Sequence, residues 1–403
     1  MASKKLQSII KEDEKYLFQN YGRRKNVCFV KGKGSLLYDQ DGKEYIDLFA
    51  GVAVCALGYG HKAHIAAIKK QAETLIHSSN HFYNKEQSEA GRLIAELSFA
   101  GKTLFGNSGT EANEAAIKLA RKFGLARSKR KYEIISFVNS FHGRTYGSMT
   151  ATGQAKIHDG FGPLPAGFTY LPFNNIKEFA KAMRKSGQIA AVMIELVQGE
   201  GGVTPAEADF TAELAAICKK NDVLLIIDEI QTGAGRTGKA FAYQHYGIEP
   251  DIITIAKGLG GGIPIGAMHA RDYLNEYLPA GSHGTTFGGN HFACAAACAV
   301  LRELQKPTFL KTAAKTGELM MNALSAGAEK LGYSKPRGLG MLIGQELPYP
   351  ASHIVDKALE RGVVINCTAG NVIRIAPPLN IPYALALKGI KIIEEIFAEE
   401  ADR

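Results

Sequence analysis

A single lysine follows an apolar run and precedes four glycines in the stretch "TIAKGLGGGIP", residues 254–264. A lysine beside a desolvating wall has a lowered pKa, and its neutral amine can form a Schiff base with an aldehyde. Asp228 stands 29 positions before Lys257, at the end of another apolar run. A carboxylate there could pair with a pyridinium nitrogen. Taken alone, Asp228 is more typical of an ordinary strand end and Lys257 of a solvated loop.

Two further groups stand where an apolar run ends. In "NSGTEANEAAIKLAR", Ser108 and Glu111 fit a capping box, and the amides of Gly109 and Thr110 would face an anion at the positive end of a helix. In "SFHGRT", residues 140–145, an aromatic ring could stack on a flat ligand and an arginine could hold a carboxylate. The combined set matches the phosphate, ring, ring nitrogen and aldehyde of pyridoxal 5'-phosphate.

The elements that must position these residues alternate along the chain. Short apolar runs, separated mostly by helical patterns, occupy residues 132–138, 190–194, 223–227, 252–256 and 265–269. This alternation predicts an α/β fold, with a mostly parallel sheet covered by helices and ligands at the carboxyl ends of the strands. Residues 29–48 predict a hairpin around an Asp-Gly turn, and 372–375 predict a strand. We expect residues 1–60 and 297–403 to form a smaller α+β domain and 61–296 to form the large cofactor-binding domain.

Composition narrows the class of protein. The 403 residues are 46% hydrophobic, and 48 basic against 39 acidic residues give a net charge of +9, which suits anionic small substrates. The basic run at 121–131 leaves nucleic-acid binding open as an alternative, although no recognition motif accompanies it. The six cysteines form no CxxC pair and predict no metal site. With no signal-peptide pattern and no long apolar stretch, we expect a cytoplasmic protein that does not enter membranes.

Seven motifs extend this interpretation: "NSGTEANEAAIKLAR", "FHGRT", "QGEGG", "DEIQTGAGRTG", "AKGLGGGIPIGA", "HGTTFGGN" and "RIAPPL". In this order they make the chain resemble the class III, fold-type I pyridoxal-phosphate aminotransferases over essentially its whole length. The resemblance implies that Lys257 is the Schiff-base lysine and proton shuttle and that Asp228 pairs with the ring nitrogen. It further implies that Phe141 and Ile230 enclose the ring and that Gln231 contacts its phenolic oxygen.

The resemblance also implies the phosphate site and the assembly. Ser108, Gly109 and Thr110 would hold the phosphate, and His142 would belong to the same cofactor-binding set. Thr286 is similar to a threonine that reaches the phosphate of the neighbouring subunit. A homodimer with shared active sites is therefore expected.

Substrate contacts follow from the same resemblance. Arg374 is similar to the arginine that binds the α-carboxylate of glutamate, and Glu200 to the partner that masks its charge when an ω-amine binds. Arg144 would hold the farther carboxylate, and Tyr21 would lie near the α end of the substrate. Val52 stands where ornithine aminotransferases carry a tyrosine that contacts a free α-amino group, so an apolar residue suits an acylated amine.

The N-terminal region is most similar to acetylornithine aminotransferases. This implies transfer of the δ-amino group of N2-acetylornithine to 2-oxoglutarate, giving N-acetylglutamate semialdehyde and glutamate in arginine biosynthesis. Cys55 and Ala56 depart from an asparagine pair common in these enzymes. The alternatives are transamination of ornithine, succinylornithine, succinyldiaminopimelate or 4-aminobutyrate, or a cofactor-binding regulator without turnover.

Overall fold

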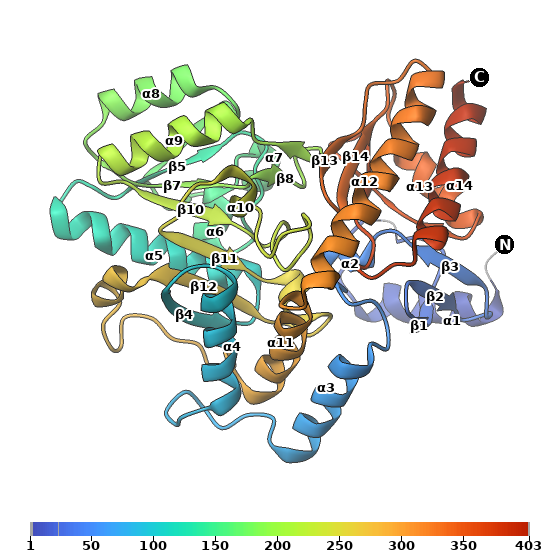
Figure 1. The fold of residues 1–403 in the computed structure, drawn as a ribbon, viewed down its shortest axis with the longest axis horizontal. Coiled ribbons are helices and arrows are strands. Elements are labelled where there is room, and N and C mark those ends of the chain that lie inside the picture. The colour runs from blue at the N-terminus through green and yellow to red at the C-terminus, as the bar shows by residue number, and fades with distance from the viewer. Residues whose placement is uncertain (1–2, 23, 402–403) are drawn as a thin grey trace.

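A seven-stranded sheet forms the centre of the larger lobe in the computed structural model, which describes residues 3–22 and 24–401 (Figure 1). Its strands, in spatial order, are β4 (Gly101–Gly106), β12 (Gly266–Arg271), β11 (Ile252–Ile255), β10 (Leu224–Asp228), β7 (Ile189–Ile194), β5 (Glu133–Phe137) and β6 (Phe168–Leu171). β12 runs antiparallel to both of its neighbours, and the other adjacent pairs are parallel. The predicted mostly parallel sheet is therefore confirmed.

Helices cover both faces of this sheet, which explains why its central strands are apolar throughout. On one face lies α5 (Gly109–Arg127), and on the other lie α8 (Ile176–Lys185) and α9 (Ala208–Lys220) (Figure 1). Side chains alternate along β10: Leu224 and Ile226 pack with α5, whereas Leu225 and Ile227 belong to the opposite cluster. Every residue of β10 is buried, including the terminal Asp228.

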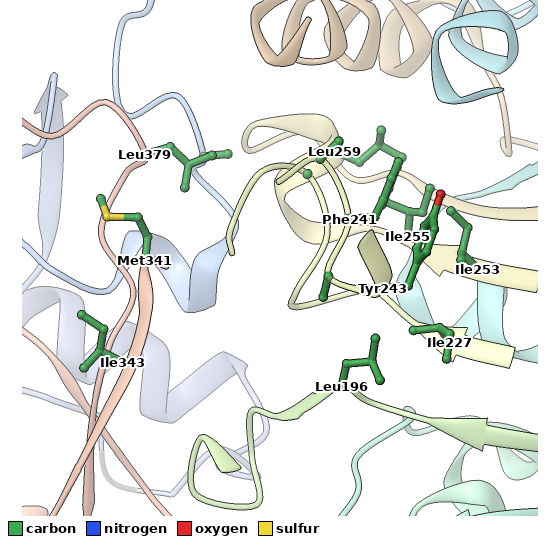
Figure 2. Close-up of a cluster of buried hydrophobic side chains, with 14 of the residues drawn as sticks. Leu196, Ile227, Phe241, Tyr243, Ile253, Ile255, Leu259, Met341, Ile343 and Leu379 are labelled. Carbon is green, nitrogen blue, oxygen red and sulfur yellow. The ribbon is translucent and has the colours of Figure 1, made fainter. Parts of the chain in front are cut away.

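The larger apolar cluster extends from the sheet to the C-terminal part of the chain. Figure 2 shows Ile227, Ile253 and Ile255 near Phe241 and Tyr243. Met341, Ile343 and Leu379, from the C-terminal part, belong to the same cluster. The two lobes thus share one continuous core beneath the ends of β10 and β11.

The smaller lobe combines both ends of the chain (Figure 1). One of its sheets has the order β1 (Phe29–Lys33), β2 (Leu36–Asp39), β3 (Glu44–Asp47) and β15 (Val363–Val364), with β15 parallel to β3. The other has the order β13 (Arg337–Leu339), β14 (Leu342–Glu346), β17 (Val372–Ile375) and β16 (Asn366–Thr368). The expected hairpin around Asp41-Gly42 is present as β2 and β3, but its first arm is shorter than expected, because a turn at Gly34 (φ +61°) divides that arm into β1 and β2.

The remaining elements connect these sheets. The helices are α1 (Lys4–Tyr16), α2 (Ala50–Ala53), α3 (Lys62–Thr74), α4 (Lys85–Leu97), α6 (Tyr146–Ala151), α7 (Ala155–His158), α10 (Tyr243–Tyr246), α11 (His291–Leu304), α12 (Pro307–Lys330), α13 (Ser352–Glu360) and α14 (Tyr383–Ala401). Two 3₁₀ helices are η1 (Lys257–Gly260) and η2 (Asp272–Tyr277), and β8 (Val197–Gln198) pairs with β9 (Thr204–Pro205). The division into domains at residues 60 and 296 stays a prediction; α11 runs through the second of these positions.

The basic run at 121–131 is used within the fold. Arg121 bonds to the carbonyl of Ala166 and lies over the ring of Phe168, with 5.0 Å from the guanidinium carbon to the ring centroid. Arg127 pairs with Asp222, and Lys131 donates to the carbonyl of Asp222 at 2.6 Å. These contacts favour a structural use of the run over nucleic-acid binding. Within residues 3–22 and 24–401, none of the helices has the length and apolarity needed to cross a membrane.

Candidate active site

A cavity of about 400 Å³ lies where β10 and β11 end. Ten residues expected at the cofactor or substrate line it: Ser108, Gly109, Thr110, Phe141, His142, Arg144, Asp228, Ile230, Gln231 and Lys257. They come from four separate chain segments, at residues 108–110, 141–144, 228–231 and 257. The convergence follows from topology, because parallel strands bring their carboxyl ends to one edge of the sheet.

Asp228 is held by three donors. Its Oδ2 accepts from Nδ2 of Asn113 at 2.8 Å and from Nδ1 of His142 at 2.7 Å, and its Oδ1 accepts from the amide of Ile230 at 3.0 Å. Burial opposes a charge on the imidazole, but the hydrogen bond and the charge of Asp228 raise the pKa of His142. The carboxylate is therefore fixed in place by hydrogen bonds to both of its oxygens.

Lys257 begins η1 directly after β11 and has a positive φ of 42°. The turn is tied down from α3, since Nε2 of His64 lies 3.0 Å from the carbonyl oxygen of Gly260. Desolvation lowers the pKa of Lys257 to about 8, although Glu200 and Asp228 favour its charged form. Near neutral pH, an appreciable fraction of this amine is therefore unprotonated and able to act as a nucleophile.

The N-terminus of α5 supplies the expected anion site. Oγ of Ser108 caps the helix by accepting from the amide of Glu111 at 3.3 Å. The reciprocal half of the capping box differs from the prediction, because Glu111 accepts from the amide of Asn107 at 2.5 Å rather than from Ser108. The amides of Gly109 and Thr110 are the first two of the helix, so they have no intrahelical acceptor and can face an anion.

The loop after β5 is positioned by polar contacts on both sides. Oγ1 of Thr110 accepts from the amide of Arg144 at 3.2 Å, and Oε2 of Glu195 accepts from the amide of Phe141 at 2.9 Å. Burial raises the pKa of Glu195 to about 7, despite the opposing effect of His142. The exposed Arg144 lies at the edge of the site, with 5.6 Å from its guanidinium carbon to the Phe141 ring centroid.

Glu200 and Arg374 form an ion pair close to the cavity. Oε1 of Glu200 lies 2.5 Å from Nη1 of Arg374, and Oε1 of Gln231 lies 3.1 Å from the same nitrogen. Burial opposes ionisation of Glu200, but the charge and hydrogen bond of Arg374 hold its pKa below the usual value. Only 3% of the Arg374 side chain is exposed, so these partners replace the water that would otherwise solvate its guanidinium.

Besides Glu200 and Arg374, three further predicted residues do not line this cavity. Tyr21 is 80% exposed, and Thr286 lines a separate cavity of about 880 Å³. Val52 is half-buried in α2, whereas its neighbour Val54 lines the site. The roles of Tyr21, Val52 and Thr286, like the roles expected of the residues that line the cavity, stay predictions.

Sequence reasoning did not single out Val54, Asn113 or Glu195. Asn113 carried the clearest signal, because it falls one helical turn after Gly109 within a quoted motif. In the part of the chain that the structure describes, His, Cys, Asp and Glu side chains form no group suited to a metal ion.

The donor set fits pyridoxal phosphate. Free amides at a helix end suit its phosphate, the buried Asp228 suits its protonated ring nitrogen, and Lys257 suits its aldehyde. Glycines keep the cavity open: a Cβ on Gly109 would lie 2.7 Å from Cδ1 of Ile230, and one on Gly143 would lie 2.3 Å from Oγ1 of Thr110. The fold and this site together define a pyridoxal-phosphate-dependent enzyme.

Similarity to known proteins identifies the family of the chain. Residues 18–397 match the family model Aminotransferase class-III, and the chain belongs to that family. It is 47% identical over 394 residues to an acetylornithine aminotransferase of Caldanaerobacter subterraneus subsp. tengcongensis, covering 97% of this chain and 99% of that protein. It is 48% identical over 382 residues to one from Aquifex aeolicus, covering 94% and 99%.

Solved structures agree on the fold. An ornithine aminotransferase from Toxoplasma gondii superposes with a TM-score of 0.94 at 32% identity, covering 100% of this chain and 97% of that one. An N-acetylornithine aminotransferase from Stenotrophomonas maltophilia gives 0.83 at 34% identity, covering 96% and 99%. The expected fold class is confirmed, and the protein is a pyridoxal-phosphate-dependent aminotransferase.

Proposed function

We propose that the protein transfers the δ-amino group of N2-acetylornithine to 2-oxoglutarate, giving N-acetylglutamate semialdehyde and glutamate, a reaction of arginine biosynthesis. The Glu200–Arg374 ion pair is the main support for this proposal. The pair would allow one site to present either a neutralised or a cationic Arg374 to the substrate. With the pair closed, the site suits the uncharged side of an acylated amine. With the pair open, Arg374 presents a cation to the carboxylate of a keto acid.

The residues around the cavity would hold different parts of the cofactor. Ser108, Gly109 and Thr110 would hold the cofactor phosphate, Phe141 and Ile230 would enclose its ring, and His142 would support Asp228 at the ring nitrogen. Gln231 accepts from Arg374 through its oxygen and also bonds to Glu200, so the second hydrogen of its amide NH₂ would reach the phenolic oxygen. The bound cofactor supplies an electron sink for the carbon that carries the amine.

Lys257 acts both as the anchor and as the proton carrier. Its Nζ would hold the cofactor aldehyde covalently, and the amine, when free, would take a proton from the substrate carbon that carries the amino group and later give it up. A pKa of about 8 suits this role, because the amine can both accept and release a proton near neutral pH.

The substrate ends are assigned by charge. Arg144, exposed at the edge of the cavity, would bind the more distant carboxylate of either substrate. Tyr21 and Val52 would lie along the acylated end, where an apolar surface needs no partner for an amino group. Ornithine is the main second candidate, since ornithine aminotransferases are among the solved structures that the chain resembles.

A panel of amine donors at fixed 2-oxoglutarate tests the substrate. We expect kcat/KM for N2-acetylornithine to exceed that for ornithine, succinylornithine, succinyldiaminopimelate and 4-aminobutyrate. Faster turnover of free ornithine would contradict the proposal. Lys257→Ala should lose the visible absorbance of the lysine-linked cofactor together with all transfer. Wild-type protein whose absorbance never responds to any amine would instead favour a regulator without turnover.

The working assembly would be a homodimer in which Thr286 of each chain completes the phosphate site of the other. This matches the position of Thr286 outside the cavity of its own chain. A mixture of Lys257→Ala and Thr286→Asp chains tests it, because a mixed dimer would contain one site built only from unchanged residues. Recovery of activity on mixing is expected, and additive loss without recovery would contradict shared sites.

A further inference from the structure

Strand β16 contacts both members of the Glu200–Arg374 pair. Asn366 lies directly opposite Arg374 in the antiparallel register of β16 and β17. Its Oδ1 accepts from Nη2 of Arg374 at 2.8 Å, while Glu200 and Gln231 occupy Nη1. The guanidinium is therefore held on its Nη2 side by the neutral amide of Asn366, and on its Nη1 side by the Glu200 carboxylate together with the neutral oxygens of Gln231 and Gly199.

The same strand fixes the main chain of Glu200. Oγ1 of Thr368, a buried residue, donates to the carbonyl oxygen of Glu200 at 2.7 Å. Two residues further on, Nε of Arg337 in β13 donates to the carbonyl of Gly202 at 3.0 Å. The backbone on this side of the pair is thus tied to the smaller lobe, whereas 31% of the Glu200 side chain remains exposed.

We propose that Asn366 and Thr368 are positioning residues that divide the pair into a fixed half and a movable half. This inference rests on the proposed function, in which Arg374 binds the carboxylate of the keto acid. When the Glu200 side chain turns away, Asn366 keeps Nη2 bonded and keeps Nη1 directed at the incoming carboxylate. Because a buried guanidinium without partners is costly, this retained bond makes the open arrangement accessible.

The neutrality of Asn366 is essential to this arrangement. An amide oxygen orients the guanidinium without cancelling its charge, and within residues 3–22 and 24–401 Glu200 is the one carboxylate that pairs with Arg374. A carboxylate at the same place would form a second ion pair with Arg374 and would compete with the carboxylate of 2-oxoglutarate in the keto-acid half-reaction. Thr368 acts on Glu200. Because it fixes the main chain of Glu200, the ion pair can open only by rotation of the Glu200 side chain.

The effects of Asn366 and Thr368 can be distinguished by measuring each half-reaction on its own, with the absorbance of the cofactor as the readout. Asn366→Asp should raise KM for 2-oxoglutarate about tenfold or more and leave the amine half-reaction within about threefold of wild type. Thr368→Val should do the opposite, weakening the amine half-reaction by about threefold with little effect on the keto acid. Cys367→Ala is the matched control, because Cys367 lies between them on β16, where side chains alternate between the two faces, and it packs against the apolar core.

Equilibrium binding of glutarate, a dicarboxylate that cannot react, provides a readout independent of turnover. We expect Asn366→Asp to weaken glutarate binding about tenfold and Cys367→Ala to leave it unchanged. Equal losses in both half-reactions, or unweakened glutarate binding to Asn366→Asp, would overturn the inference even if wild-type protein transaminates acetylornithine. Absence of amino transfer from every donor would overturn the proposed function, whatever the glutarate result.

Discussion

Nδ1 of His142 lies 2.7 Å from Oδ2 of Asp228, and at most 3% of either side chain is exposed. Asn113 donates to the same oxygen from α5, so the carboxylate cannot rotate without breaking two bonds. The position of Asp228 therefore depends on α5 and the loop after β5 as much as on its own strand.

Asp228→Asn tests this carboxylate. The amide keeps the size of the side chain but removes the anion that would keep the ring nitrogen protonated. We expect the rates of both half-reactions to fall by on the order of 100-fold or more, measured in single turnovers with saturating substrates. Asp228→Glu keeps the charge and should retain more activity than Asn. Equal rates for Asp228→Asn and wild type would show that the charge is not needed.

Gly109→Ala tests the packing at the phosphate end. The new Cβ would lie 2.7 Å from Cδ1 and 2.9 Å from Cγ2 of Ile230, which must then shift toward the ring. Titration of cofactor-free protein with pyridoxal phosphate should show an affinity about tenfold or more weaker. Gly91→Ala is the control, since its Cβ would approach no closer than 3.9 Å to Thr103. Equal losses in the two variants would point to a general effect on folding.

Lys257→Met tests the lowered pKa in the cofactor-free protein. The folded protein releases the Lys257 proton near pH 8, whereas the unfolded chain holds it to about pH 10.4. Between these values the unfolded state binds more protons, so stability rises with pH. The free energy of unfolding of wild type, relative to Lys257→Met, should rise by up to about 3 kcal/mol across this window.

Urea unfolding at a series of pH values measures this difference. Lys177→Met is the control, because Lys177 is exposed on α8. Its stability should change in parallel with wild type. Parallel curves for Lys257→Met would mean that the amine has its ordinary pKa in the folded protein.

Val52→Tyr tests the choice between acetylornithine and ornithine. A tyrosine there would offer a hydroxyl to a free α-amino group and would crowd an acyl group. The ratio of kcat/KM for ornithine over acetylornithine should rise about tenfold. Val30→Tyr, on the exposed edge of β1, serves as the control and should leave the ratio unchanged. An unchanged ratio in Val52→Tyr would place the specificity elsewhere, with Val54 the next position to examine.

Much of the fold could be predicted because its signals are local. The apolar runs before Asp228 and Lys257 are strands β10 and β11, and they are neighbours in the sheet. The direction of β12 could not be predicted, because a buried strand is apolar whether it runs parallel or antiparallel. The turn at Gly34 was missed because the Asp-Gly signal of the second turn dominated that region.

The site likewise contains residues that the sequence could predict and residues that it could not. Residues within quoted motifs, such as Ser108, Phe141 and Gln231, line the cavity. Asn366 and Thr368 were not predicted as site residues. Asn366 reaches Arg374 because the two residues are opposite each other in the register of β16 and β17. Thr368 bonds to Glu200, which lies more than 160 positions away in the sequence. No local pattern encodes such a long-range pairing.

The bond from Thr368 to the carbonyl of Glu200 has a consequence for the speed of the reaction cycle. Rotation of a partly exposed side chain on a fixed main chain takes picoseconds to nanoseconds, whereas loop or domain closure takes microseconds to milliseconds. Exchange between the two charge states would then be far faster than typical turnover, at roughly 10 per second. The alternation between donor and acceptor would behave as a rapid pre-equilibrium, and its position rather than its rate would set selectivity.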